Sequence, residues 1–456
     1  MKHSNPLMLL MLKYISRADA ERLDDLLSEM HRFDVRRCLA RLEPPARAEC
    51  FRLLNAEILS EIISDMDEDD QIEAFSLMTD EKMRDVLNDM PIDDVVDVLG
   101  VMDDDEVRDL LPQLEDQEEV SRLMAFALDS AAGLMTTEFI SIAESLTVQE
   151  AIQVIQHSAD DAETIYYIYV VDDENRPVGV LSLRELLAAG WVEPIRDVMK
   201  ENLVTVEEGI DQEEVAHIIA KYDLLAVPVI NRNGEISGII TVDDIVDVIE
   251  EESTEDLFKM AGLIEQGEDN DEFRSARLIQ SDLGTIIRIR LPWLLLALVG
   301  GMIAGGVIGA FEEILQTIVA LAFFIPVIMD MGGNVGTQSS TIFVRGFALG
   351  HVDRDRFFPY LFGELKVGLS LGAISGFLVA LMAYMWQRNV VLALIVSASM
   401  AFTVVLATVI GFAIPWGLAK MNWDPAAGSD PLITTIKDVT GLMIYFSLAG
   451  ALMQYL

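Results

Sequence analysis

The sequence predicts a multidomain membrane protein with an α-helical, solenoid-like N-terminal domain, an α/β pair of repeats and an all-α transmembrane domain of five helices. Three observations predict this fold class. The acidic excess is confined to the first part of the chain, residues 131–252 contain two similar halves, and the last third is built of long charge-free runs. The expected boundaries are 1–130 for the helical domain, 131–252 for the repeats, 253–290 for a connecting helix and 291–456 for the membrane domain.

The charge of the chain is distributed unevenly. The formal net charge is −44, and residues 286–456 carry nine acidic and nine basic residues, so residues 1–285 hold the whole excess. Such a lobe repels itself unless counter-ions collect, and it argues against nucleic acid or an anionic bilayer surface as a partner. Cys38 and Cys50 form no metal-type pair and the five histidines are scattered, which excludes zinc and thiol-redox sites. Because the acidic lobe belongs to a chain that also crosses a membrane, we expect a cation as its partner. The alternative is a solvated, strongly charged surface.

A twelve-residue repeat runs through the helical domain. Apolar residues recur at Met66, Met78, Met90, Met102 and Leu114, with acidic clusters between them. Twelve residues fit one short helix and a tight turn, so we expect stacked helices in a small solenoid. The acids that follow each turn would also stabilise helix N-termini, which is the structural alternative to ion binding for any one cluster.

Residues 131–252 contain two copies of one strand–turn–strand–helix pattern. Residues 166–171 and 226–230 are predicted strands, each followed by a turn, a second strand and a helix. The region resembles a tandem pair of CBS domains, which implies a paired module that binds adenine nucleotides or ions. Its nucleotide-type motif matches Thr241 and Asp244, whereas the first half has Ser182 and Glu185 at these positions. ATP is therefore an expected ligand of the pair.

The membrane domain follows a polar connecting helix that becomes amphipathic toward its end. Each charge-free or nearly charge-free run is long enough to cross a hydrocarbon core of about 30 Å. The runs are residues 291–311, 314–344, 367–387, 389–419 and 439–456. Basic residues are more numerous on one side of the spans, so the positive-inside rule predicts cytoplasmic N-terminal domains and an external C-terminus in the plasma (inner) membrane.

The first polar stretch in the membrane spans residues 326–341, and polar residues at this depth mark a pathway. It contains Gly-Gly-Asn-Val-Gly-Thr-Gln-Ser at 332–339. We expect its proline and glycines to break the second span, which is tolerated only where backbone lines protein or water. The freed carbonyls, at Gly333 and Gly336, and the side chain of Asn334 are then hard oxygen ligands.

The second polar stretch, residues 424–441, opens the fifth span and places Asp438 about two turns into the helix. Mg²⁺ dehydrates reluctantly and is held by one or two carboxylates, so one aspartate per subunit at a two-fold axis suits it. The alternative is an Asp438–Lys437 pair, although neighbours in a helix point apart. Glu364 is a further candidate, and its alternative is an ion pair with Lys366 or an arginine.

These segments together resemble the MgtE family of magnesium channels from end to end. The most specific matches are residues 332–339 and Thr-Thr-Ile-Lys-Asp-Val-Thr-Gly at 434–441. The resemblance implies a homodimer whose pore is lined by the second and fifth spans, with Asp438 as the pore aspartate and the connecting helices as a plug. Asp430 stands where many members have glycine, and it adds a carboxylate at the cytosolic mouth.

The resemblance also implies that Mg²⁺ bound between the cytosolic domains holds the pore shut. The carboxylates that it implies for the sensor and the intracellular mouth are Asp244, Asp247, Glu255 and Asp256. We expect Mg²⁺ to bridge these acids to three acids of the helical domain, Asp93, Asp94 and Asp97. Binding would remove repulsion and favour a closed dimer, and low Mg²⁺ would loosen the gate.

The predicted function is Mg²⁺-selective uptake through a gated, passive channel. The alternative is a secondary transporter that exchanges Mg²⁺ against Na⁺ or H⁺. Alternating access commonly comes with inverted repeats around broken helices, and neither an inverted repeat nor an even number of spans is visible in the sequence. We expect no enzyme, because the sequence has no nucleophile–base pair and no phosphate-binding loop.

Overall fold

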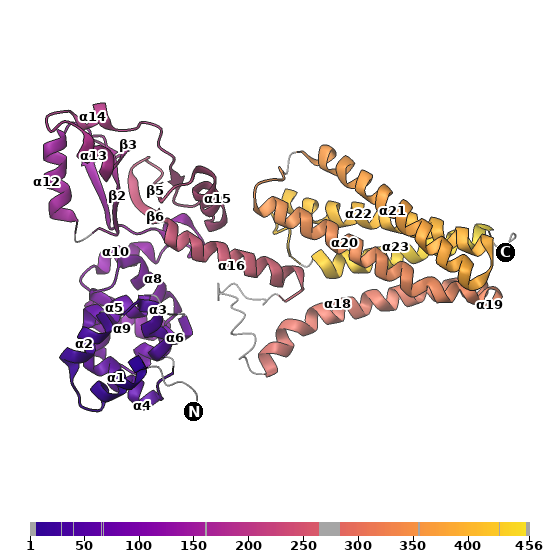
Figure 1. Ribbon diagram of the computed structural model, residues 1–456, viewed down its shortest axis with the longest axis horizontal. Coiled ribbons are helices and arrows are strands. Elements are labelled where there is room, and N and C mark those ends of the chain that lie inside the picture. The colour runs from indigo at the N-terminus through magenta and orange to yellow at the C-terminus, as the bar shows by residue number, and fades with distance from the viewer. Residues whose placement is uncertain are drawn as a thin grey trace. The chain divides into compact units, whose positions relative to one another are not determined.

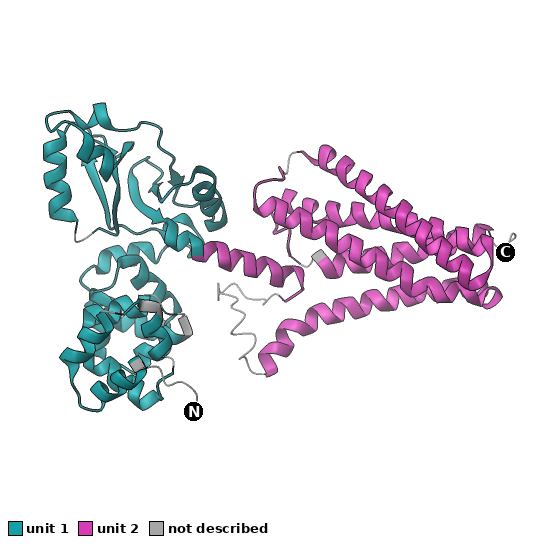
Figure 2. Ribbon diagram, in the orientation of Figure 1, with its two compact units in different colours: residues 1–246 teal, residues 247–456 magenta. Residues whose placement is uncertain are grey.

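A computed structural model describes residues 6–28, 30–39, 41–64, 66, 68–159, 162–263, 283–353, 356–427 and 429–452 (Figure 1). These residues form two compact units, residues 1–246 and 247–456 (Figure 2). The first unit contains short helices followed by two small sheets, and the second contains five long apolar helices. The fold class expected from the sequence is therefore confirmed.

The helical domain is a series of short helices with a regular pitch. They are α1 Pro6–Ile15, α2 Ala20–Ser28, α3 Arg32–Leu39, α4 Pro44–Leu53, α5 Ala56–Ser64, α6 Glu68–Ser76, α7 Asp80–Asn88, α8 Ile92–Val101, α9 Asp104–Leu110, the 3₁₀ turn η1 Leu111–Gln113 and α10 Gln117–Leu123. The helices α5 to α9 begin twelve residues apart, as the repeat predicts. Met66 and Met90 are buried at the turns, and Asp93 and Asp94 lie in the first turn of α8, where a negative charge stabilises the helix N-terminus.

The two repeats each fold into a three-stranded sheet with helices. The first contains α11 Ala131–Leu134, β1 Phe139–Ala143, α12 Val148–Ser158, β2 Thr164–Val171, β3 Pro177–Ser182, α13 Leu183–Ala188 and α14 Ile195–Val198. The second contains β4 Val206–Glu207, α15 Gln212–Tyr222, β5 Ala226–Ile230, β6 Ile236–Thr241 and α16 Val242–Met260. In both sheets the first strand is parallel to the central strand, and the third is antiparallel to it. This shared topology accounts for the repeated sequence pattern.

The connecting segment is described only at its two ends. Residues 253–260 form the last part of α16, and Gly262 follows with a φ of 70°, a left-handed conformation that favours glycine and ends the helix. Residues 283–290 already belong to the first membrane helix. Residues 264–282, which include the amphipathic part of the expected connecting helix, lie outside the described residues.

Among the described residues of the second unit, five helices are long and apolar enough to cross a membrane, as expected. The unit contains α18 Leu283–Ala310, α19 Glu312–Thr317, the 3₁₀ segment η2 Val319–Phe324, α20 Ile325–Ala348, α21 Phe357–Gln387, α22 Val390–Lys420 and α23 Ser429–Leu452. α22 packs against α20, α21 and α23. Half of its most apolar stretch is buried, compared with 11% for α18, so α22 is the centre of the bundle.

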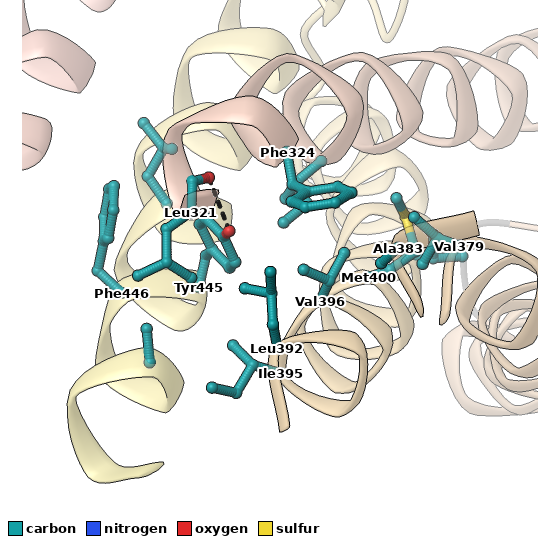
Figure 3. Packing of buried hydrophobic residues seen from close by; sticks show 14 of the residues in the cluster. Leu321, Phe324, Val379, Ala383, Leu392, Ile395, Val396, Met400, Tyr445 and Phe446 are labelled. Carbon is teal, nitrogen blue, oxygen red and sulfur yellow. Dashed lines mark hydrogen bonds between the residues drawn. The ribbon is translucent and has the colours of Figure 1, made fainter. Parts of the chain in front are cut away.

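The core of this unit lies where α20, α22 and α23 meet. Buried side chains from these helices and from η2 pack together around Phe324, Val396 and Phe446 (Figure 3). Tyr445 is fully buried there, and its hydroxyl donates a hydrogen bond of 2.8 Å to the carbonyl oxygen of Leu321. A buried tyrosine hydroxyl needs such a partner, and this bond joins α23 to η2 just before α20 begins.

The predicted break in the second span is wrong. α20 is one continuous helix from Ile325 to Ala348, and Pro326 lies in its first turn, where the missing N–H has no intrahelical partner to lose. The glycines serve close packing instead. A Cβ at Gly336 would lie 3.0 Å from Ile433 Cγ2 on α23, and one at Gly332 would lie 3.1 Å from Thr403 Cγ2 on α22. Small residues let membrane helices approach closely, so the glycine motif positions α20 against its neighbours.

A matched pair of substitutions on α21 tests this role of glycine. A Cβ at Gly372 would lie 2.8 Å from the carbonyl oxygen of Ala401, whereas one at Gly363 would meet nothing within 4 Å. We expect Gly372→Ala to lower the free energy of unfolding by about 1–3 kcal/mol through overpacking. Gly363→Ala is expected to be neutral or stabilising by up to about 1 kcal/mol, because alanine favours helix.

Thermal unfolding of the full-length protein in detergent measures the difference between the two variants. Equal midpoints for Gly372→Ala and Gly363→Ala would contradict the packing argument.

Candidate functional site

The fifth span holds Asp438 beside a buried lysine. Asp438 is 18% exposed and Lys437 is 5% exposed. Lys437 Nζ lies 2.9 Å from Asp438 Oδ1 without the alignment of a hydrogen bond, and it donates a hydrogen bond of 2.8 Å to the carbonyl oxygen of Met329. The expectation that these neighbours point apart is wrong, because the long lysine stem curves back to its own neighbour. Asp438 thus has an internal counter-ion.

The second span, α20, presents a polar stripe on the face opposite the glycines that receive Lys437. Asp330, Asn334 and Gln338 follow one another at intervals of four residues and are exposed in the single chain. The amide of Asn334 donates a hydrogen bond of 3.3 Å to Asp330 Oδ2. Residues at this spacing share one helix face. An exposed polar face in a membrane-spanning helix is costly unless it meets water or protein.

The two further carboxylates predicted in the membrane unit bind hydroxyl groups of α20. The hydroxyl of Thr337 donates a hydrogen bond to Asp430 Oδ1, and the hydroxyl of Ser339 donates one to Glu364 Oε2. Both carboxylates are half-buried. Glu364 thus contacts Ser339. The sequence suggests either an ion ligand or an ion pair with Lys366 or an arginine, and neither interpretation includes this serine. The predicted residues Asn334, Asp430, Glu364 and Asp438 therefore all lie on or against α20 and α23.

Gly333 and Gly336 have a different part in the site from the one predicted. Both lie inside the continuous helix α20, so their carbonyls are not freed by a break. A Cβ at Gly333 would lie 2.5 Å from Lys437 Nζ. The absence of a side chain at Gly333 therefore leaves room for the ammonium group beside α20.

In the first unit, α8 and the beginning of α16 bring carboxylates together. Asp93 Oδ1 is buried and accepts no hydrogen bond from the described residues. Burial raises the pKa of Asp93 well above its usual range, and the negative charges of Asp94, Asp244 and Glu163 raise it further. Burial also raises the pKa of Asp244 to about 6, although a hydrogen bond from Thr241 opposes this shift. These acids destabilise one another when they are charged and no cation is present.

Glu163 was missed in the sequence. It directly precedes the strand β2, far along the chain from α8, and no local pattern distinguishes it from the other acids of the lobe. Asp97, the third acid predicted on α8, is exposed.

A second group of charged residues joins the end of α16 to the loop before α23. Lys259 Nζ lies 2.6 Å from Glu255 Oε1 and 2.6 Å from Asp424 Oδ2. Burial lowers the pKa of Lys259. The negative charges of Asp424 and Glu255 and their hydrogen bonds with Lys259 have the larger effect, so the net change is a raised pKa. Burial and the charge of Asp424 raise the pKa of Asp256 to about 7. Glu255 and Asp256 were predicted as ion ligands, whereas Lys259 was missed.

Asp247, the other acid predicted on α16, is exposed and lies at the first position of the second unit. Within the residues that the structure describes, no three histidine, cysteine, aspartate or glutamate side chains are grouped closely enough to hold a metal ion by themselves.

The predicted nucleotide motif forms the start of α16. Thr241 Oγ1 donates a hydrogen bond of 2.5 Å to Asp244 Oδ2. The equivalent pair in the first repeat, Ser182 and Glu185, forms a capping box at the start of α13. Both motifs therefore stabilise helix N-termini.

A cleft of about 300 Å³ lies between the two repeats, with aromatic, polar and charged side chains from both. Its lining includes Tyr167, Ser182, Arg184, Lys200 and Asn202. Lys200 Nζ lies 2.5 Å from Glu185 Oε1, and the hydrogen bond with Lys200 is the main reason that the pKa of Glu185 falls to about 2. Thr241 and Asp244 do not line this cleft.

Three family models match the chain in the order of its domains. The model for the MgtE intracellular N domain matches residues 30–129, and the CBS domain model matches residues 131–191 and 195–251. The MgtE model, described as a divalent cation transporter, matches residues 325–448. These ranges coincide with the helical domain, the two repeats and most of the membrane helices.

Named relatives match about three quarters of the chain. The magnesium transporter MgtE of Thermus thermophilus is 38% identical over 338 residues, which cover 74% of this chain and 73% of the relative. The protein of the same name from Bacillus subtilis is 36% identical over 346 residues, 75% of this chain and 74% of the relative.

Solved structures resemble the N-terminal half of the chain. The crystal structure of the soluble part of a magnesium transporter has a TM-score of 0.52 and 34% identity, and it covers 54% of this chain and 98% of the solved one. The cytosolic domain of the Mg²⁺ channel MgtE in complex with ATP has a TM-score of 0.51 and 33% identity, and it covers 53% of this chain and 99% of the solved one. The chain therefore belongs to the MgtE family of magnesium transporters.

Proposed function

We propose that the protein is a Mg²⁺-selective channel that imports the ion passively, driven by the membrane potential. The observation that carries this proposal is the exposed polar stripe of α20, Asp330, Asn334 and Gln338. The helix α23, which packs against α20, adds the carboxylate Asp438. Exposed polar side chains at membrane depth need water or another protein surface. A second copy of the chain facing this stripe would enclose a water-filled path, so the proposal includes a homodimer.

The chemistry of the stripe suits Mg²⁺. The ion keeps several of its waters and is commonly held by one or two carboxylates rather than by a complete protein cage. One Asp438 from each subunit, with amide and hydroxyl oxygens along α20, meets this requirement. Softer metals favour sulfur and imidazole ligands, and the residues proposed here offer oxygen atoms only. Asp430 would add a carboxylate at the cytosolic mouth, and Glu364 lies behind α20 as a partner of Ser339.

We propose that the acidic cytosolic domains sense the ion. A divalent cation would relieve the repulsion among Asp93, Asp94 and Asp244 and favour a closed arrangement. Asp97, Asp247, Glu255 and Asp256 extend the acidic surface. The positive-inside rule supports a cytoplasmic sensor and a C-terminus on the outside. We propose the plasma membrane as the location of the protein.

ATP is proposed as a further ligand of the repeat pair, because a related cytosolic domain was solved in complex with ATP. Arg184 and Lys200 line the cleft between the repeats, and cationic side chains suit phosphate groups. Thr241 and Asp244 would contribute if the nucleotide reaches the start of α16.

Asp438→Asn tests the pore assignment. The substitution keeps the size of the side chain and removes the charge that offsets dehydration of the ion, so Mg²⁺ currents should fall at least about 100-fold, as for a loss of about 3 kcal/mol of ion stabilisation. The measurement is electrical recording of the full-length protein in bilayers. Asp353→Asn, which removes an acid from a loop of the same unit, is the matched control and should conduct normally.

The same recordings separate a channel from an exchanger. Unitary Mg²⁺ currents in the wild type support the channel, and strict coupling to Na⁺ or H⁺ with no unitary current would overturn it. Normal current from Asp438→Asn would refute the pore assignment.

Asp93→Asn tests the sensor. The folded-state pKa of Asp93 lies above its usual value of 3.8, so the stability linked to its protonation is present at low pH and is lost as pH rises through the folded pKa. At pH 7.5 without divalent ions, the Asn variant should be more stable than the wild type, because it carries no buried charge for Asp94, Asp244 and Glu163 to repel. It should also gain less stability from added Mg²⁺ and should need more internal Mg²⁺ for closure.

Thermal unfolding with and without Mg²⁺, at pH 5 and 7.5, measures these differences. Asp109→Asn, on the exposed surface of α9, is the control and should behave as the wild type does. If Mg²⁺ stabilises Asp93→Asn as much as the wild type, the sensor lies elsewhere. K⁺ at matched ionic strength distinguishes specific binding from screening.

A further inference from the structure

Lys437 is a buried cation in the middle of the proposed conduction machinery. It is 5% exposed, although lysine is almost never fully buried without a partner. Its ammonium group has two partners, the carbonyl oxygen of Met329 at 2.8 Å and Asp438 Oδ1 at 2.9 Å. The first contact joins α23 to α20, and the second neutralises the carboxylate to which the pore role is assigned.

The neighbouring helix is shaped to receive this ammonium group. A Cβ at Gly333 would lie 2.5 Å from Lys437 Nζ, and a Cβ at Gly332 would lie 3.4 Å from Lys437 Cδ. Any side chain at Gly333 would therefore displace the charged group. The glycine pair of α20 forms a notch that holds the lysine stem and its head, so the position of the charge is fixed by both helices.

The charge at this place has a consequence for ion binding. The positive charge of Lys437 cancels the negative charge of Asp438. The oxygen Asp438 Oδ1, which faces the ammonium group, is buried. A divalent ion that binds Asp438 must share the carboxylate with the ammonium group or displace it. Repulsion between the two cations at a few ångström is screened little inside a protein.

We propose that Lys437 is a tethered competitor of the transported cation and sets the affinity of the Asp438 site. A weak site favours conduction, because an ion must also leave it. Lys437 thus determines the ion affinity of the Asp438 site, and it is positioned by Met329 and by the notch at Gly332 and Gly333. This inference rests on the proposed function, in which Asp438 binds the permeating ion.

The simpler role for Lys437 is a clamp between α20 and α23. A clamp predicts that its loss weakens the fold and leaves ion affinity unchanged or lower. A competitor predicts that its loss raises ion affinity while the maximal rate falls, because release becomes slower. The two roles therefore differ in the direction of the change in half-saturating concentration.

The experiment measures Mg²⁺ uptake by the full-length protein in liposomes with internal Mg²⁺ chelated, so that cytosolic closure does not intervene. We expect Lys437→Met and Lys437→Gln to lower the half-saturating Mg²⁺ concentration about tenfold, the change that corresponds to 1.4 kcal/mol. Gln keeps a donor for the Met329 carbonyl and so serves if the Met variant does not fold. Lys437→Arg keeps the charge and should retain the wild-type value more closely.

Lys366→Met is the matched control, because it removes the same charge from an exposed position on α21, and it should leave half-saturation unchanged. An unchanged or higher half-saturating concentration in a folded Lys437→Gln variant would overturn the inference. Asp438→Asn, measured in parallel, separates the proposed pore role of Asp438 from the competitor role of Lys437. If its uptake is normal, the proposed function fails, and if it is inactive while Lys437→Gln shows no shift, only the competitor role fails.

Discussion

A carboxylate that is taken out of water needs a cation nearby, and this constraint governs the described acidic groups at Asp438, Asp424 and Asp93. Burial without a counter-charge raises the pKa of an acid and weakens the fold at neutral pH. Asp438 is neutralised by Lys437, and Glu255 and Asp424 share Lys259. Asp93 differs from both, because the charged groups that shift its pKa are acids. A divalent ion bound there would therefore offset repulsion between acids.

Close packing of membrane helices makes the intramembrane site possible. Without a hydrophobic driving force between helices, association depends on small residues that allow close contact. Gly332, Gly333 and Gly336 have this role along α20, where they receive Thr403, Lys437 and Ile433. The same contacts leave the opposite, polar face of α20 exposed in the single chain. One helix thus combines a packing face with a face suited to water and ions.

The sequence predicted the order of the domains, the five spans and the twelve-residue pitch, because each follows from a local pattern of hydrophobicity. The break in α20 was predicted wrongly, since glycine and proline lower helix propensity but tertiary packing overrides it. Glu163 and Lys259 were missed because their roles depend on residues far away in the chain. The ligand assignments themselves, from Asp93 to Asp438, stay predictions that follow from chemistry and resemblance.

A lysine held by its own stem cannot diffuse away, and this separates the two kinds of acidic site. Asp438, beside Lys437, and Glu255 and Asp424, beside Lys259, stay paired with a positive charge when the concentration of Mg²⁺ falls. The packing of the helices that carry them therefore loses little stability. In the proposed sensor, the acids around Asp93 would be neutralised by ions from solution, and their repulsion would return when those ions leave. A gate of the proposed kind requires this division, because its sensor has to loosen at low Mg²⁺ while its pore helices stay packed. The placement of lysines is thus as informative about gating as the placement of acids.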